Sequence, residues 1–117
     1  MATEHRIYGI PFADVYELYI KKLERKGRDV ADLDVVIEWL TGFDRPTLES
    51  HLAAKTNFRD FFAAANINAN APLIKGVICG VRIEEIEDPL MREIRYLDKL
   101  VDELGNGRPM SKILRTA

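Results

Sequence analysis

Four acidic side chains stand close together late in the chain. Glu84, Glu85, Glu87 and Asp88 fall within residues 84–88, just before a long amphipathic segment. Clustered carboxylates can hold a hard cation, or two of them can act as an acid and a base when their environments separate their pKa values. A helix N-terminus also favours such a cluster, because negative charge complements the helix dipole. We interpret these acids as a solvated helix start.

The remaining metal-binding and nucleophilic side chains are few and widely separated. His5, His51 and Cys79 share no close spacing of the C-x2-C or H-x3-H kind that metal sites use. Cys79 lies in an apolar run, which predicts a buried and inert thiol. A single cysteine also excludes an internal disulfide framework. The sequence therefore assigns no metal ligand, no cofactor-binding residue and no catalytic residue.

A helix–turn–helix arrangement over residues 32–54 is the pattern that could contact nucleic acid. Two predicted helices, 32–40 and 45–54, are joined by a short turn that contains Gly42. In this hypothesis the second helix enters a major groove and a basic island at residues 21–28 touches phosphates. The DNA-contacting side chains would be Lys21, Lys22, Arg25, Lys26, Arg45, Thr47, Ser50 and His51.

The charge balance argues against this hypothesis. The net charge is −2, and the basic residues form two small islands, at residues 21–28 and at the C-terminus, on an acidic body. A nucleic-acid-binding protein usually shows a larger basic surface. Glu49 also lies among the residues that would read the bases. We interpret the islands as solvated helix ends, where positive charge complements the helix dipole.

An enzyme would need a site that no known motif marks. The sequence contains no nucleophile–base pair, no glycine loop that cradles phosphate and no paired-cysteine metal site. A catalytic site would have to be assembled from separated acids and from the tyrosine and arginine surface of the last long helix. The sequence therefore favours a protein without catalysis.

The element that would position these groups is a long helix that begins at Pro89. Asp88 can cap it, and proline is well suited to the first helical position. Apolar residues recur at steps of four and three, at Leu90, Ile94, Leu97, Val101 and Leu104. Gly105 and Gly107 supply a stop. We expect Arg92, Arg95, Asp98, Lys99, Asp102 and Glu103 on its exposed side.

Four shorter helices are predicted upstream, over residues 11–26, 30–41, 45–55 and 57–65. Their starts are marked by Pro11, Asp29, Asp44 and Thr56, which can open or cap a first turn. Three phenylalanines, Phe58, Phe61 and Phe62, fall in the last of these helices. Burying them requires a large contact area, so we expect this short helix to lie centrally.

The segment 72–86 fits two structures. Its apolar residues follow a helical period, but VICGVRI is also rich in the β-branched residues that strands favour. We predict a helix over residues 72–79 and an irregular link through Glu87. A buried strand over VICGVRI is the alternative, and a small strand pair between residues 6–8 and 81–83 is compatible with the predicted helix. A final helical turn is predicted from Pro109.

Length and composition bound the architecture. A chain of 117 residues with 47% hydrophobic residues can build one core, so we predict a single domain over residues 1–117. The pattern predicts a compact all-α bundle of about six helices, with room for one minor two-stranded β pairing. No apolar run is long enough to cross a bilayer, and no signal-peptide pattern is present, so we expect a cytoplasmic protein.

Several strings resemble a known family. FADVYELYIKKLERKGR, VIEWLTGFD and GVICGVRIEEIEDPLMREIRYLDKLVDEL, with the closing KIL, are similar to short bacterial proteins grouped as domain of unknown function 2200. The resemblance covers nearly the whole chain and implies a small helical fold in a bacterial cytoplasm. It implies no activity, so no catalytic residue transfers. Residues 105–107 depart from the family, whose members look more helical there.

We therefore predict a small binding or interaction module that acts through protein contacts. Its partners would be proteins, with a homo-oligomer among the options, and neither a membrane nor a cofactor is expected. Nucleic acid is the partner in the alternative helix–turn–helix hypothesis. An enzyme with an unrecognised site is the second alternative.

Overall fold

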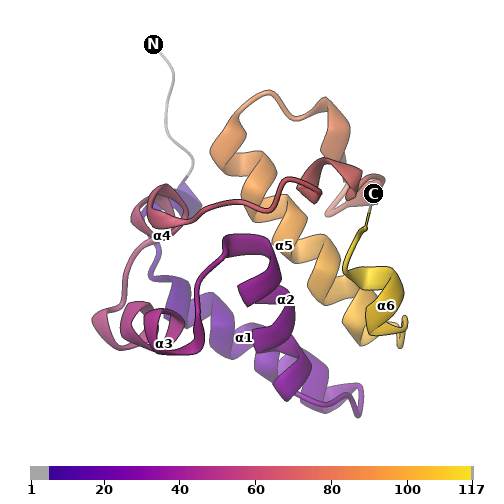
Figure 1. Ribbon diagram of the computed structural model, residues 1–117, viewed down its shortest axis with the longest axis horizontal. Helices are drawn as coiled ribbons and strands as arrows, with labels where there is room; N and C mark the ends of the chain where they lie inside the picture. Colours follow the sequence, from indigo (N-terminus) through magenta and orange to yellow (C-terminus); the bar gives the residue numbers. More distant parts are fainter. Residues whose placement is uncertain (1–5, 117) are drawn as a thin grey trace.

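The computed structural model describes residues 6–116, which form six α-helices, three short 3₁₀ helices and one two-stranded sheet (Figure 1). The α-helices are α1 (Phe12–Arg25), α2 (Ala31–Thr41), α3 (Arg45–Ala54), α4 (Phe58–Ala64), α5 (Pro89–Gly105) and α6 (Met110–Ile113). The other elements are η1 (Arg6–Gly9), η2 (Ala71–Leu73), β1 (Val77–Ile78), β2 (Val81–Arg82) and η3 (Ile83–Glu85). The predicted all-α class with one minor strand pair is confirmed.

The long helix α5 runs through the middle of the molecule and packs against α1, α2, α4 and α6 (Figure 1). Its predicted start is confirmed, because an Asp88 side-chain oxygen accepts the backbone N–H of Leu90 at 3.0 Å and Pro89 occupies the first turn. Its apolar stripe is buried from Ile94 to Leu104. Burial of this stripe is the main contribution of α5 to stability, at about 1.5–3 kcal/mol per large side chain.

One residue predicted to be exposed on α5 is instead buried. Glu103 is 4% exposed, and its carboxylate accepts hydrogen bonds from the Arg115 guanidinium at 2.5 and 2.8 Å and from the Arg108 guanidinium at 3.2 Å. The prediction was wrong because the chain after α5 folds back and places two guanidinium groups over that face. These ion pairs fasten the C-terminal segment to α5.

The segment 72–86 forms a β-hairpin, so the predicted helix over residues 72–79 was wrong. Val77 pairs with Arg82 and Ile78 with Val81. Cys79 and Gly80 form the two-residue turn, with φ of 53° and 76°. Two consecutive positive φ values are typical of the type I′ turns that match strand twist. The suggested partner segment, residues 6–8, belongs instead to η1.

Cys79 lies at the tip of this hairpin and is exposed. The prediction of a buried thiol was wrong because it rested on the assumption that the apolar run is one helix. In a hairpin whose two strands are this short, the two turn residues point away from the core. Val77 and Val81 on the strands are also exposed.

Aromatic rings join the start of α1 to α4. The ring of Phe12 stacks on that of Phe61 at 3.9 Å and meets the edge of Phe58 at 5.5 Å between centroids. The backbone N–H of Phe12 donates to the Thr56 carbonyl at 2.8 Å. The predicted burial of the three phenylalanines of α4 is confirmed, but the helix lies toward one side of the molecule and not at its centre (Figure 1). Its cap is Asn57, whose side chain accepts the N–H of Asp60 at 2.8 Å.

Three tyrosine hydroxyls of the N-terminal region donate to aspartates on other elements. Tyr8 bonds Asp88 at the start of α5, Tyr16 bonds Asp34 of α2 at 2.6 Å, and Tyr19 bonds Asp98 of α5 at 2.5 Å. Tyr19 is buried. These bonds hold η1 and α1 in register against α2 and α5.

Because of the hydrogen bond from Tyr19, we expect the free energy of unfolding to fall at alkaline pH. Burial, and then the Asp98 carboxylate, raise the pKa of the Tyr19 hydroxyl well above its ordinary value of 10.0. The folded state holds this proton more tightly, so its contribution is complete below about pH 10 and is lost as the pH rises further. We expect the Tyr19→Phe variant to lose stability less steeply above about pH 10, by up to about 1.4 kcal/mol per pH unit.

Urea unfolding at several alkaline pH values measures this difference. The comparison concerns the slope with pH, since losing the hydrogen bond also lowers stability below about pH 10, by about 1–3 kcal/mol. Equal slopes in the two proteins would show that Tyr19 keeps its ordinary pKa in the fold.

Candidate functional site

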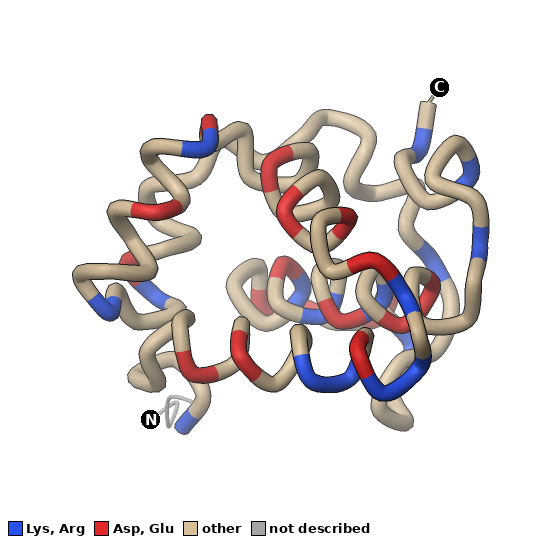
Figure 2. Tube along the Cα trace, turned by 90° about the horizontal axis from the view of Figure 1, so that it is seen from below, with Lys and Arg blue, Asp and Glu red and all other residues tan. Residues whose placement is uncertain are grey.

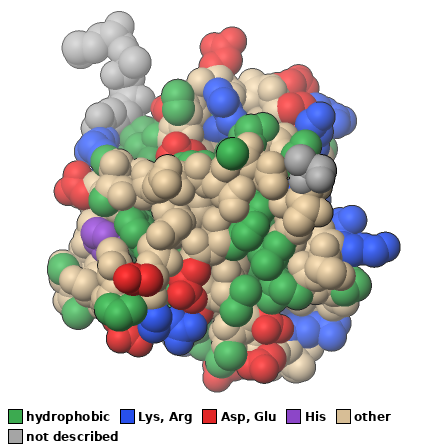
Figure 3. Space-filling model, viewed as in Figure 1, with side chains coloured by type: hydrophobic (Ala, Val, Ile, Leu, Met, Phe, Trp, Pro, Cys, Tyr) green, Lys and Arg blue, Asp and Glu red, His purple; other side chains and the backbone are tan. Residues whose placement is uncertain are grey.

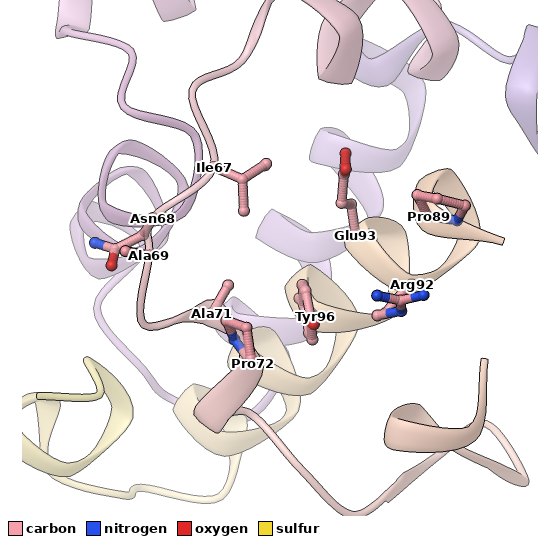
Figure 4. Close-up of a pocket in the computed structure, with 9 residues that line it drawn as sticks. All are labelled: Ile67, Asn68, Ala69, Ala71, Pro72, Pro89, Arg92, Glu93 and Tyr96. Atoms are coloured by element: carbon pink, nitrogen blue, oxygen red, sulfur yellow. The ribbon is translucent and has the colours of Figure 1, made fainter. Parts of the chain in front are cut away.

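A hollow of about 240 Å³ lies between residues 67–72 and the first half of α5 (Figure 4). Its walls are mostly apolar on the loop side and polar on the helix side. The residues that line the hollow include Ile67, Ala69, Pro72, Arg92, Glu93 and Tyr96. In Figure 4, Glu93 extends from the helix on the side of Ile67, Tyr96 lies beside Pro72, and Arg92 lies on the far side of Tyr96, below Pro89.

A second hollow of about 300 Å³ adjoins the first along α5. Both are lined by Pro89 and Glu93, so they meet at these two residues. The second is bounded by α4 through Phe62 and Ala63. We call the two together the α5 groove, which runs between α5 on one side and α4 with residues 67–72 on the other.

Arg92 is held firmly at one end of the α5 groove. Its Nε donates to the carbonyl of Ile86 at 2.9 Å, and its Nη2 donates to that of Glu87 at 3.1 Å. Its Nη1 forms no hydrogen bond or ion pair with any of residues 6–116. A guanidinium fixed on one edge keeps its other edge oriented for an anionic partner.

Tyr96 presents a second donor beside Arg92. Tyr96 is 6% exposed, and its hydroxyl has no hydrogen-bond partner among the described residues. In the same part of the chain, no fully buried side-chain nitrogen or oxygen lacks a partner. The hydroxyl is therefore accessible at the groove wall while the ring is packed in the core. Tyrosine suits such a place, because its apolar ring carries a polar tip.

Glu93 lies where the two hollows meet. It is half-buried and forms no ion pair with the described residues. Burial raises the pKa of the Glu93 carboxyl above its ordinary value, Arg92 partly opposes the rise, and Asp88 adds to it. A half-buried carboxylate that has a raised pKa and no ion-pair partner is typical of a functional site, although structural networks of charged groups can show the same pKa shift.

The shifted pKa of Glu93 predicts a gain in stability when its charge is removed. A raised pKa means that the protonated form is favoured in the fold, so this contribution is present below about pH 4.5 and lost at higher pH. We expect Glu93→Gln to raise the urea midpoint near pH 7 and to leave it unchanged in acid. The exposed neighbour Glu87 provides the control, since Glu87→Gln should change neither value. A Glu93→Gln protein that is less stable near pH 7 would contradict this.

A third hollow of about 440 Å³ separates α1 from α3. Its acids, Asp14 and Glu17, are exposed, and its Tyr16 hydroxyl is already bonded to Asp34. The third hollow offers no half-buried charge or unused donor comparable with those of the α5 groove.

Figure 3 shows a further feature of the surface, a stripe of hydrophobic side chains beside α2 and α5 that is flanked by charged ones.

The acids highlighted in the sequence serve local structure. Glu84 accepts the N–H of Gly76 at 3.0 Å, which lowers the pKa of its carboxyl, and it pairs with Arg82 at 3.3 Å. Glu85 pairs with the same arginine at 3.6 Å. The Tyr8 hydroxyl lowers the pKa of Asp88. Within residues 6–116 no three His, Cys, Asp or Glu side chains form a metal-binding group, and His5 lies outside the described residues.

The predicted DNA-contacting residues of α3 are partly engaged elsewhere. Arg45 pairs with Glu38 at 3.2 Å and lies 3.5 Å from Asp34, both on α2. The ring of His51 packs against those of Phe43 and Phe61, at centroid distances of 4.8 and 5.4 Å, and its Nδ1 contacts the Thr56 hydroxyl at 3.0 Å. Thr47 and Ser50 are exposed.

The basic island lies at the other end of α1 from α3. Lys22 lies 3.7 Å from Asp102, and Arg28 donates to the Gly105 carbonyl at 3.2 Å. The Lys26 side chain covers Gly105, while Lys21 and Arg25 are exposed. Figure 2 shows basic and acidic residues interleaved along this stretch. The structure therefore does not bring the island and α3 onto one face.

Sequence reasoning missed the α5 groove, although one signal was present. Glu93 stands three residues after Leu90 and four before Leu97, which places a charge on the apolar stripe itself. A charged residue at such a position predicts either a buried ion pair or an opening in the core. Tyr96, one position off the stripe, gave no comparable signal.

The described helices include none that is both long and apolar enough to cross a membrane. A search of curated proteins gives no significant match. Among solved structures, the crystal structure of an uncharacterised protein, SP1917, is similar to this chain. It has a TM-score of 0.89 and 43% sequence identity over 97% of this chain and 94% of that one.

The profile of a bacterial family matches residues 6–115. That match covers almost all of the chain, and the similarity in sequence and fold to SP1917 agrees with it. The chain therefore belongs to the family of uncharacterised proteins conserved in bacteria known as domain of unknown function 2200.

Proposed function

We propose that this protein is a binding module that takes an extended segment of a partner protein into the α5 groove. The observation that carries the proposal is that two hollows adjoin along α5 and share Pro89 and Glu93 as lining residues. Adjoining hollows with apolar walls and a few polar groups suit a short extended chain better than a flat protein surface.

The polar groups of the groove support this proposal because the fold does not use them fully. The Tyr96 hydroxyl and the Glu93 carboxylate have no partner among the described residues, and Arg92 has an unused edge. Polar groups with unused hydrogen-bonding capacity in an otherwise apolar hollow are typical of the few groups that orient a bound partner. Apolar contacts from Phe62, Leu90 and Ile67 would supply binding energy.

The test uses a pool of random-sequence hexapeptides with acetylated N-termini and free carboxyl groups. We expect the pool to shift backbone amide NMR signals of the ¹⁵N-labelled protein in residues 59–72 and 89–96. Two exposed alanines line the groove, Ala63 in the second hollow and Ala69 in the first. Ala63→Phe and Ala69→Phe should fill it and abolish the shifts.

Ala53→Phe is the matched control, because Ala53 is an exposed alanine on α3 that lines none of the three hollows. This variant should bind the pool as the wild type does. If the pool shifts no signals, or shifts them only around α2 and α3, the groove is not the binding site.

The helix–turn–helix alternative makes a separate prediction. A DNA-binding protein would bind random-sequence duplex more tightly as salt falls, and would lose this when its phosphate-contacting lysines and arginines are reversed in charge. We expect no such binding at low salt, because Arg45 is paired with acids of α2 and the basic island lies away from α3. Salt-dependent binding that disappears when Lys21, Lys22, Arg25 and Lys26 are changed to Glu would contradict this.

A further inference from the structure

We propose that the α5 groove recognises the free C-terminal carboxylate of its partner protein. This inference rests on the proposed function and adds the chemistry of the bound segment. It would place the carboxylate against Arg92 and Tyr96, with the preceding residues running past Glu93 toward α4.

Arg92 provides the first contact for a carboxylate. Two backbone carbonyls, those of Ile86 and Glu87, hold its Nε and Nη2 in place. The side chain therefore loses little freedom on binding, and its Nη1 edge stays available. Arginine matches the planar geometry of a carboxylate better than lysine does, and such charge-assisted bonds are among the strongest in proteins.

Tyr96 provides the second contact. It stands four residues after Arg92, so both side chains emerge from the same face of α5. Figure 4 shows Tyr96 beside Pro72 and Arg92 further along α5, toward Pro89. The Tyr96 side chain is more than nine-tenths buried, yet its hydroxyl lacks a partner among the described residues. A carboxylate oxygen at this place would receive both a hydroxyl and a guanidinium donor.

Glu93 sets the direction of the bound chain. It extends on the other side of α5, beside Ile67, and would repel a carboxylate placed there. Its oxygens can accept backbone N–H groups from the residues that precede the terminus. The second hollow, between Phe62 and Leu90, would then take an apolar side chain of the segment. The charge of Glu93 thus favours apolar or basic residues directly beside it and disfavours acidic ones there, while Arg59 adds a positive charge to the lining of the second hollow.

The deciding experiment compares the hexapeptide pool with the same pool amidated at its C-terminus. We expect the free-acid pool to bind at least about tenfold more tightly, the usual scale for losing a charge-assisted hydrogen bond. Tyr96→Phe should weaken binding of the acid about three- to tenfold and leave the amide unchanged. Arg92→Lys should also weaken only the acid, because it keeps the charge and loses the planar fork.

Tyr96→Phe should melt at the wild-type temperature, since the hydroxyl it removes has no partner among residues 6–116. Equal binding of acid and amide in the groove would overturn the carboxylate inference and leave the proposed function standing. Absence of any binding would overturn the proposed function itself. N-acetylleucine that binds as tightly as the acid pool would also overturn the inference, because the site would then suit a small carboxylic acid and not a protein terminus.

Discussion

Replacing Glu103 with alanine is expected to lower the free energy of unfolding by about 3–5 kcal/mol, the cost of leaving one half of a buried ion pair unpaired. Glu103 is 4% exposed and binds both Arg115 and Arg108. Without it, the Arg115 guanidinium, whose side chain is 14% exposed, keeps only backbone carbonyls as partners. Urea unfolding monitored by circular dichroism measures the loss.

The adjacent residue supplies the control for this prediction. Asp102 lies one position earlier on α5, and its side chain is 33% exposed and pairs with Lys22 only at 3.7 Å. Surface pairs of this kind contribute about 0–1 kcal/mol, so Asp102→Ala should change stability little. If the two variants lose the same free energy, the C-terminal segment is not fastened through Glu103.

Replacing Phe61 with alanine is expected to cost about 3–5 kcal/mol, because it opens a cavity where four aromatic rings meet. Phe61 is fully buried. Its ring stacks on Phe12 and meets the edges of Phe43 and Phe62, at centroid distances of 3.9, 5.1 and 5.3 Å. The loss combines burial of a large side chain with ring–ring contacts worth about 0.5–1.5 kcal/mol each.

Val35 serves as the reference for the aromatic prediction, because it is a large apolar residue that is 39% exposed on α2. Val35→Ala should stay within about 0.5 kcal/mol of the wild type. Thermal and urea unfolding of the two variants would show whether the aromatic cluster or a more general loss of apolar area sets stability. A Phe61→Ala protein as stable as Val35→Ala would mean that the cluster is not central.

The residues of the candidate site differ from these in what they do for the fold. Glu103 and Phe61 hold elements together, whereas Glu93 and the Tyr96 hydroxyl have no partner in the described chain. Tyr19 and Tyr96 illustrate the contrast, since the Tyr19 hydroxyl joins α1 to Asp98 and the Tyr96 hydroxyl bonds to none of residues 6–116. Stability measurements and binding measurements should therefore separate the two groups of residues.

The sequence by itself determined most of the α-helices and several of their ends, because these depend on neighbouring residues. The Asp88-Pro89 start of α5, the Asp44 cap of α3 and the Gly42 end of α2 are all present. Each follows from a local hydrogen bond or an allowed backbone angle, which no distant contact has to supply. The buried face of α5 could also be predicted from the sequence, because the residues that recur with the helical period are the ones that are buried.

The tertiary structure decided the features that depend on contacts between distant segments. Residues 72–86 fit both a helix and a hairpin by period, and the choice of the hairpin reversed the expected burial of Cys79. Glu103 became buried only because Arg115, twelve residues further on, returns to cover it. The α5 groove likewise exists only where residues 67–72 and α4 approach Glu93. Local patterns specify local geometry, but which polar groups end up paired or unpaired is set by segments that meet only in the folded chain.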